Sequence, residues 1–466
     1  MGTRYILMRK MMCNELKNDL TIYVSVVIPS LNVAEYMEEC LESVTRQTLK
    51  EIEILCIDAG STDGTLRVIE KYASGDPRIR LIGSDKKSYG YQVNLGIREA
   101  RGKYIGIVEP DDYIDKTMYQ SLYSHTNNYF PDFIKGGYIE FASIKGRRVC
   151  AEVSRSHLAD VFDQLIFFGD AREMGILEIN HIWAGIYRRD FLIKKNIRLN
   201  ETTGASYQDI SFSILVGLLA DTGIYVNEHY YFYRIDNENS SVKSSSKWRC
   251  VMDEYEYITK ELTQREMYTS DIRKLVCLQK LVSYQWNAVR LSEKEREEFL
   301  LAVQPELKDF SEEGSLYADL TDSQKESVKL LRNRTVLRGY LNEKQEQSRR
   351  LGKLFAKIEQ GEKFVLVSAG RYGERMLLLQ EMSGIKCMKA VADNNPMLQG
   401  KIWNGYSIIS VPEAVQKYKS DTFIIANRKH SDKIQKQLEN MGISSDKIFA
   451  VSNMLSFEEM LGLVFP

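Results

Sequence analysis

Three acidic side chains follow one apolar run closely enough to share a cation. Residues 104–108 are mainly apolar, and Glu109, Asp111 and Asp112 come directly after them. Carboxylates this close repel one another unless a positive charge neutralises them. Hard oxygen ligands on a short turn suit Mg²⁺ or Mn²⁺, ions that keep several waters and bridge to substrate phosphates. The alternative is a solvated acidic turn that caps the next helix.

A fourth acid, Asp58, ends another apolar run. It follows residues 52–57 and precedes a tight turn with Gly60 and Ser61. Capping of the next helix would explain residues 61–63, but it does not explain Asp58. The carboxyl end of a strand in an α/β sheet is where such sheets bind ligands, so Asp58 could accept a hydrogen bond from a nucleobase or a ribose. The four acids together favour a site for a cation and a diphosphate.

A parallel sheet is needed to bring these acids together, and the pattern of residues 21–245 predicts one. Apolar runs at residues 24–28, 52–57, 79–82 and 104–108 alternate with helical periods, which is typical of an α/β domain. We expect the first strand to end before Pro29, and the next helix to bury Met37, Leu41 and Val44. Residues 246–358 lose the strands and form an amphipathic helical region. Its apolar stripe is Leu275, Leu278, Val282, Trp286 and Val289.

Three ordered stretches of the first half of the chain resemble family 2 glycosyltransferases of the GT-A fold. They read VSVVIPSLN at residues 24–32, DAGSTDGT at 58–65 and RGKYIGIVEPDDY at 101–113. The resemblance implies a nucleotide-diphosphate sugar donor, with a UDP-sugar favoured, and Mn²⁺ or Mg²⁺ as cofactor. It also implies inversion at the anomeric carbon and a hydroxyl acceptor in surface polysaccharide or glycoconjugate synthesis.

The same resemblance assigns roles by position. The nucleotide-sugar site would comprise Pro29, Ser30, Asn32, Glu35, Asp58, Gly60, Ser61, Asn94 and Asp111. Asp112 is the strongest candidate for a metal ligand, followed by Asp111 and then Glu109. Two departures stand out, because Ala59 takes the place of a second acid and Glu109 that of a commoner Asp. They keep open a rival function, a nucleotide-sugar or glycan-binding module without turnover.

The region downstream of the acidic turn, which would bind the acceptor, contains the expected catalytic base. In GASYQDISF at residues 204–212, Asp209 matches the family's catalytic acid at a helix start, with Gln208 in place of the usual Glu. A carboxylate there would remove the acceptor proton, and a helix-capping role is compatible with that function. Trp183 offers a flat face for an acceptor sugar, although a tryptophan buried in the core is the alternative.

A small doubly wound domain is predicted for residues 359–466, where strands and helices alternate again. The stretch VSAGRYG at residues 367–373 with Asp393 carries part of a dinucleotide fingerprint, in which Ser368 replaces the first Gly. The region resembles Rossmann-like domains appended to bacterial polysaccharide-biosynthesis enzymes. Nucleotide binding and a structural or protein-contact role both remain open.

The amino-acid composition limits the classes of binding partner and the cell compartment that we expect for this protein. Lys and Arg total 63 against 64 Asp and Glu, which argues against a general nucleic-acid binder. No apolar run reaches the ~18–20 residues that cross a bilayer, and the seven scattered cysteines suit a reducing compartment. We therefore expect a cytoplasmic enzyme that acts on a glycan or lipid-linked acceptor, the latter requiring transient contact with the membrane. Homo-oligomerisation stays open, and a sugar nucleotidyltransferase ranks last because residues 29–35 carry no basic side chain.

Overall fold

A computed structural model describes residues 21–126, 129–169, 171–176, 181–240, 247–311, 314–427, 429–451 and 456–462. The described chain forms two compact units. The first takes residues up to Ile139, Glu152–Tyr233 and Asn239–Ser283, and the second takes Glu140–Ala151, Arg234–Glu238 and residues from Tyr284 onward. Among the described helices, none combines the length and the apolar character needed to span a bilayer.

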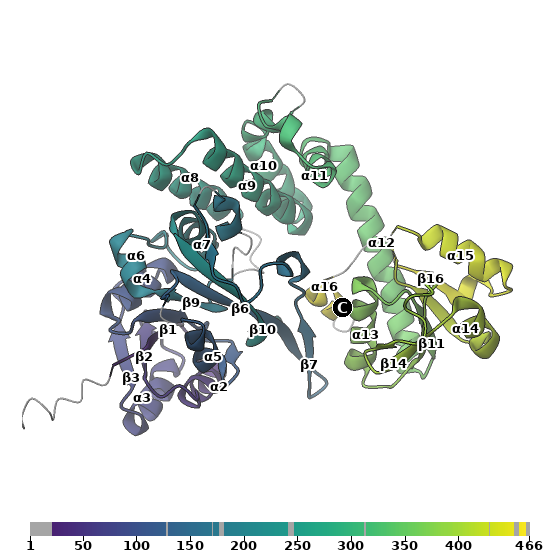
Figure 1. Ribbon diagram of the computed structural model, residues 1–466, viewed down its shortest axis with the longest axis horizontal. Coiled ribbons are helices and arrows are strands. Elements are labelled where there is room, and N and C mark those ends of the chain that lie inside the picture. The colour runs from purple at the N-terminus through teal and green to yellow at the C-terminus, as the bar shows by residue number, and fades with distance from the viewer. Residues whose placement is uncertain are drawn as a thin grey trace, which may run out of the picture. The chain divides into compact units, whose positions relative to one another are not determined.

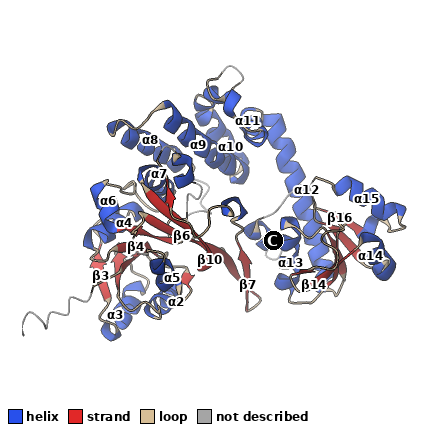
Figure 2. Ribbon diagram, in the orientation of Figure 1, coloured by secondary structure: helices blue, strands red, loops and turns tan. Residues whose placement is uncertain are grey.

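The first unit is built on a mixed sheet with the strand order β3-β2-β1-β4-β9-β6-β10-β5 (Figures 1 and 2). The strands are β1 Val24–Ser30, β2 Ile52–Asp58, β3 Ile79–Gly83, β4 Tyr104–Ile107, β5 Tyr113–Ile114, β6 Phe133–Ile144, β9 Gly185–Arg188 and β10 Thr222–Arg234. Strand β7 (Arg147–Glu152) pairs with β6, and strand β8 (Ile166–Phe167) pairs with β10. Strands β1 to β4 run parallel to one another, so β1, β2 and β4 end at the same edge of the sheet. This edge is where the candidate acids follow their strands.

The described part of the first unit includes seven helices that end before residue 270. They are α2 Ala34–Thr45, α3 Thr65–Gly75, α4 Tyr89–Glu99, α5 Met118–Ser124, α6 Arg189–Lys194, α7 Gln208–Leu219 and α8 Arg249–Gln264. The predicted stripe of α2 is confirmed, since Met37, Leu41 and Val44 are fully buried. Helix α4 packs closely on β1 because Gly96 has no side chain: a Cβ there would lie 2.4 Å from Val27 Cγ1.

Strand β1 continues through Pro29, which corrects the predicted end at residue 28. Pro29 pairs with Ile57 and Ser30 with Asp58 on the β2 side. On the other side, pairing with β4 ends at Val27. The nitrogen of Pro29 faces that side, beyond the end of β4, so the missing N–H removes no ladder hydrogen bond.

The predicted helical region is confirmed, but its apolar stripe is only partly buried. It contains α8, α9 Ser270–Arg290, α10 Glu293–Val303, α11 Asp322–Arg332 and α12 Arg334–Glu359. In α9 the buried positions include Val276, Leu281 and Ala288, whereas Val282 is 57% exposed and Trp286 44%. The spacing of the apolar residues, three or four apart, therefore predicted the helix correctly, but it did not predict which face of the helix is buried.

The second unit contains the predicted doubly wound sheet, with the order β13-β14-β12-β11-β15-β16. Its strands are β11 Phe364–Val367, β12 Met388–Ala392, β13 Ile402–Trp403, β14 Tyr406–Ile409, β15 Thr422–Ile425 and β16 Ile448–Ala450. All neighbours are parallel except β13 and β14. The helices are α13 Arg371–Ser383, α14 Val411–Tyr418, α15 Ser431–Asn440 and α16 Phe457–Leu461. Helix α13 begins directly after Gly370, its N-cap.

Candidate active site

Asp58 organises the turn that follows β2. Its Oδ1 accepts from the backbone N–H groups of Gly60 (2.9 Å) and Ser61 (2.8 Å). Its Oδ2 accepts from Ser30 Oγ (3.0 Å) and Ser61 Oγ (2.6 Å). The side chain is 3% exposed, and each oxygen already accepts two hydrogen bonds. Asp58 thus ties the ends of β1 and β2 together, and the positive φ of 85° at Gly60 lets the chain turn around its carboxylate.

The same turn caps helix α2, which starts from a different segment of the chain. The backbone N–H groups of residues 32, 33 and 34 donate to Ser61 Oγ (2.8 Å), Thr65 Oγ1 (2.9 Å) and Asp63 Oδ2 (2.9 Å). The bonds of residues 33 and 34 satisfy N–H groups that a helix start leaves without a partner, and the bond of residue 32 holds the residue before them. In return, Asn32 Oδ1 accepts from the N–H of Thr62 at 2.8 Å. We call residues 30–34 and 58–65 the paired loops.

The predicted donor-site residues on the paired loops and directly beside them fall into a buried and an exposed group. Pro29 and Ser30 are buried and support the edge from within, whereas Asn32, Glu35 and Gly60 are exposed. A donor could therefore touch Asn32, Glu35 and the backbone of Gly60 directly.

The acidic turn after β4 is held by two tyrosines. Tyr231 on β10 accepts from the backbone N–H of Glu109 (3.0 Å) and donates to Asp112 Oδ2 (2.8 Å). Tyr89, at the start of α4, donates to Glu109 Oε1 at 2.5 Å. Asp112 is 1% exposed, while Glu109 and Asp111 are half-buried. The turn is thus fixed at both ends, with Asp111 between them.

Crowding of acids and burial shift the proton affinity of this turn. Burial raises the pKa of Glu109 to about 8; the Tyr89 hydrogen bond opposes this rise, and the charges of Asp111 and Asp209 add to it. In the described residues no three His, Cys, Asp or Glu side chains converge as a metal site. Mg²⁺ and Mn²⁺ need no such group, because one or two carboxylates can hold them together with substrate phosphates. Asp111 and Asp112 fit that donor chemistry.

Asp209 lies in the first turn of α7, as predicted. It is half-buried, and burial raises its pKa to about 6 although the N–H groups of Asp209 and Ile210 and the charge of Lys135 lower it. The residue therefore keeps a carboxylate of raised basicity within the first turn of α7, whose N-cap is Tyr207. Its neighbour Gln208 braces the preceding loop: its Oε1 accepts from the N–H of Ser206 (2.6 Å), and its Nε2 donates to Thr202 Oγ1 (2.9 Å).

The loop before α7, residues 199–207, is clamped by helix α4. The N–H of Tyr89 donates to the carbonyl of Gly204 (3.0 Å), and the N–H of Gly204 donates to the carbonyl of Lys87 (2.8 Å). A Cβ at Gly90 would lie 2.0 Å from the carbonyl oxygen of Asn200. The start of α4 therefore contacts both the acidic turn, through Tyr89, and the loop that carries Asp209.

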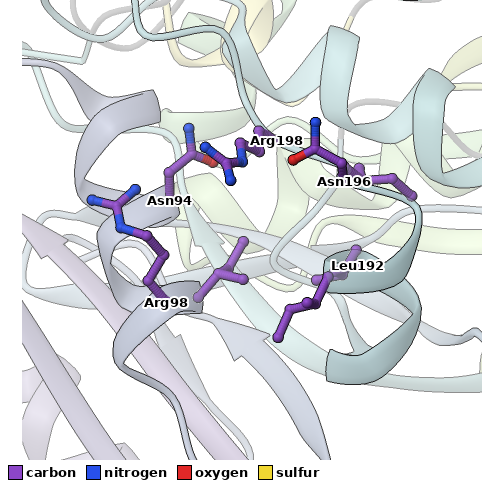
Figure 3. A pocket seen from close by; sticks show the side chains of 8 residues that line it. Asn94, Arg98, Leu192, Asn196 and Arg198 are labelled. Carbon is purple, nitrogen blue, oxygen red and sulfur yellow. The ribbon is translucent and has the colours of Figure 1, made fainter.

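Asn94 belongs to this clamp rather than to the exposed donor edge. Its Nδ2 donates to the carbonyl of Leu199 (2.9 Å) and to Glu201 Oε1 (3.2 Å), and its Oδ1 accepts from the N–H of Leu199 (3.0 Å). It is 2% exposed. It borders a hollow of about 220 Å³ with Arg98, Asn196 and Arg198 (Figure 3). Its amide is thus already used to hold residue 199.

Trp183 is only 6% exposed. Its ring stacks on Tyr231 (centroids 4.1 Å apart) and on Tyr233 (5.3 Å), and Tyr138 meets it edge-on at 4.9 Å. This geometry favours the packing alternative over an open sugar platform. Through Tyr231, the packed ring also supports the residue that holds the acidic turn.

Sequence reasoning missed Gln92, Tyr89 and Tyr231. Gln92, 4% exposed, donates from Nε2 to the carbonyls of Ser30 (2.9 Å) and Ile57 (2.6 Å), so it joins the ends of β1 and β2. One signal could have found it, namely an amide between the apolar positions of a helix that must pack on the sheet. The two tyrosines carried no such signal, because their partners are far away in sequence.

The glycine turn of the second unit holds itself together. Ser368, which replaces the first Gly of the fingerprint, has a φ of +85°, a conformation that favours glycine. Asp393 accepts from the N–H of Ala369 (Oδ2, 3.1 Å) and from the N–H of Asn395 (Oδ1, 2.8 Å). The acid that could bind a ribose thus already bonds to the loops beside it.

Comparisons with known proteins match two regions of the chain. Residues 25–191 match the family described as "Glycosyl transferase family 2", and residues 363–449 match "C2185-like, N-terminal". The chain is 29% identical over 232 residues to the uncharacterized glycosyltransferase EpsJ of Bacillus subtilis, covering 50% of this chain and 66% of EpsJ. It is 27% identical over 228 residues to glycosyltransferase GlyA of Streptococcus pneumoniae, covering 48% of this chain and 32% of GlyA.

Two further similarities reach more of the chain. The cholesterol galactosyltransferase of Borreliella burgdorferi is 26% identical over 317 residues, which cover 63% of this chain and 86% of that protein. The crystal structure of S. aureus TarS aligns with a TM-score of 0.50 and 18% identity, covering 66% of this chain and 52% of TarS. At this identity the TarS likeness shows the fold alone.

Proposed function

We propose, from the premise that residues 25–191 belong to glycosyl transferase family 2, that the chain moves a sugar from a nucleotide-diphosphate donor to a hydroxyl acceptor. One observation carries the proposal. Tyr89 links the acidic turn to the loop before Asp209: its hydroxyl donates to Glu109 Oε1 at 2.5 Å, and its N–H donates to the carbonyl of Gly204 at 3.0 Å. Asp209 follows that loop, in the first turn of α7. A basic carboxylate thus adjoins the acids that follow the neighbouring parallel strands, as transfer next to a diphosphate requires.

The donor would lie along the carboxyl edge of β1, β2 and β4. Asn32, Glu35 and Gly60 are exposed there for the nucleoside, for which we propose uridine. Ser30, Asp58 and Ser61 would keep the paired loops in place beneath it. Asp112 and Asp111, with Glu109 as a weaker ligand, would hold Mn²⁺ or Mg²⁺. Bound there, the cation would neutralise the charge that develops on the departing diphosphate.

Asp209 would act as the general base. As the acceptor oxygen forms its bond to the anomeric carbon, the bond from that carbon to the diphosphate oxygen breaks. The acceptor proton passes to the carboxylate of Asp209. Attack from the face opposite the leaving group inverts the anomeric centre. Helix α7 and the clamped loop before it would keep this carboxylate in place, because Gln208 and α4 fix that loop.

A donor screen tests the proposal. The screen would use UDP-sugars and GDP-mannose, each with and without Mn²⁺. We expect at least one of these nucleotide sugars to raise the melting temperature of the full chain. A ligand at about 100 times its Kd stabilises the native state by about 2.7 kcal/mol. The same donor should release its nucleotide diphosphate when acceptor is added. Asp112→Asn should weaken the Mn²⁺-dependent part of the shift. A chain that binds no nucleotide sugar and releases no diphosphate would contradict the proposal.

The pH dependence of transfer should report Asp209. Because its pKa is raised to about 6, the carboxylate can accept a proton above that pH and loses this ability below it. We expect kcat/KM to fall as the pH drops through about 6 and not near 4, where an unperturbed aspartate titrates at about 3.9. Lys135→Met should move the midpoint upward, because the Lys135 charge lowers the pKa of Asp209. A midpoint near pH 4 in the unmodified chain would argue against Asp209 as the base.

A further inference from the structure

The charge of the first unit is unevenly distributed. Residues 80–103 and 188–201 together contain eleven Lys or Arg and four Asp or Glu, although the whole chain has a net charge of −1. We infer that these two segments, here called the basic face, dock the protein on an anionic bilayer surface. The inference does not depend on the donor, the cation or the catalytic base.

The two segments form one surface. The amide of Asn94 bonds to both the N–H and the carbonyl of Leu199, and the N–H of Arg189 donates to the carbonyl of Lys103 at 2.9 Å. Arg98 from the first segment and Arg198 from the second line the same hollow, together with Asn94 of α4 and Leu192 of α6 (Figure 3). Cations separated by about 100 residues in sequence therefore lie beside one another.

Few of these cations are neutralised by neighbouring acids. Arg80 pairs with Glu53 and Glu99. Lys86 pairs with Glu201, and Arg188 pairs with Asp132. The other eight make no ion pair with a carboxylate of the described chain: Lys87, Arg98, Arg101, Lys103, Arg189, Lys194, Lys195 and Arg198. All of these except Arg189 are exposed. The face thus offers a concentrated positive charge to a partner of opposite sign.

Exposed apolar side chains adjoin these cations. Ile193 is 48% exposed on α6 directly before Lys194, and Tyr129 and Phe130 are 71% and 38% exposed. The Lys103 Nζ lies 5.7 Å from the ring centroid of Phe130. Lys and Arg mixed with aromatic and aliphatic tips suit the headgroup region of a bilayer, where charges meet lipid phosphates and the tips enter the acyl boundary. A soluble polyanion would satisfy the cations but would leave the apolar tips in water.

Vesicle sedimentation of the full chain tests the inference. We expect the chain to pellet with phosphatidylcholine vesicles that contain about one third phosphatidylglycerol, and to stay in the supernatant with pure phosphatidylcholine. Raising the salt should release it, because salt screens exposed charges. K194E/K195E/R198E should lower the bound fraction about tenfold or more, since each basic residue near an anionic surface contributes to binding. Ile193→Ser should weaken binding while leaving its salt dependence unchanged.

A matched variant separates a specific face from net charge alone. K429E/K433E/K436E makes the same change of charge at exposed lysines of the second unit, and it should bind vesicles like the unmodified chain. Melting temperature and donor hydrolysis should be unchanged in both triple variants, which shows that the fold is intact. Equal losses in the two variants, equal binding to neutral vesicles, or capture by a soluble oligonucleotide in place of the vesicles would each overturn the inference.

Discussion

Asp209→Asn should lower kcat for sugar transfer by about 10²- to 10⁴-fold, the usual contribution of a positioned general base. The amide keeps an oxygen that can accept from the N–H groups of Asp209 and Ile210, so helix α7 should still form. It has no basicity at neutral pH, and the acceptor proton would have no recipient. Donor affinity should change little, because the donor would rest mainly on the paired loops.

A matched substitution makes this result interpretable. Asp271 also lies in the first turn of a helix, α9, and is exposed. Asp271→Asn therefore removes an equivalent charge without touching the candidate site and should leave kcat unchanged. Stopped-flow or coupled measurement of diphosphate release, with donor affinity determined separately, gives both quantities. Full activity in Asp209→Asn would eliminate this residue as the base and leave the donor-site proposal standing.

Gly90→Ala should be strongly disruptive although alanine normally favours a helix. The added Cβ would lie 2.0 Å from the carbonyl oxygen and 2.9 Å from the carbonyl carbon of Asn200, and a backbone cannot yield as a flexible side chain can. We expect a loss of about 1–3 kcal/mol in stability, the usual cost of forcing extra atoms into a packed contact. Because the displaced loop leads to Asp209, kcat should fall more than the KM for the donor changes.

Gly339 provides the control for that experiment. It lies inside α12, and a Cβ there would meet no heavy atom within 4 Å. Gly339→Ala should stabilise its helix by about 0.5–1 kcal/mol, because alanine loses less backbone entropy than glycine. The melting temperature should therefore fall in Gly90→Ala and rise in Gly339→Ala. The steady-state kinetics should change only in Gly90→Ala. A neutral Gly90→Ala would mean that α4 and residue 200 do not press together.

Elements with a strong apolar period could be predicted from sequence to within a few residues. Strand β2 and helix α2 follow directly from runs and stripes whose buried faces are continuous. The bounds failed where local chemistry decides them, as at Pro29, whose missing N–H is harmless only because of where β4 ends. Helix α9 shows the other limit. Its apolar residues surround much of the helix, so spacing alone could not indicate that Trp286 stays exposed.

The sequence predicted the candidate site only where its residues are close to one another in sequence and directly follow a strand. Asp58 with Ser61, and the run from Glu109 to Asp112, follow their strands within a few residues, so the fold brings them to one edge. Position in the sequence did not predict the contacts of side chains whose partners are far away in sequence. Asn94 is committed to Leu199, and Trp183 is packed against tyrosines of β10. A position shared with a family indicates a neighbourhood, whereas the partner of each polar atom depends on the tertiary packing.

The reciprocal capping of the paired loops restricts how donor preference could be re-engineered in this protein. Residues 32–34 depend on hydroxyl and carboxylate groups of Ser61, Asp63 and Thr65, while Thr62 depends on Asn32. Transplanting either segment alone from a homologue would leave both the helix start and the glycine turn without their partners. A chimera intended to accept a different nucleotide should therefore exchange both segments at once.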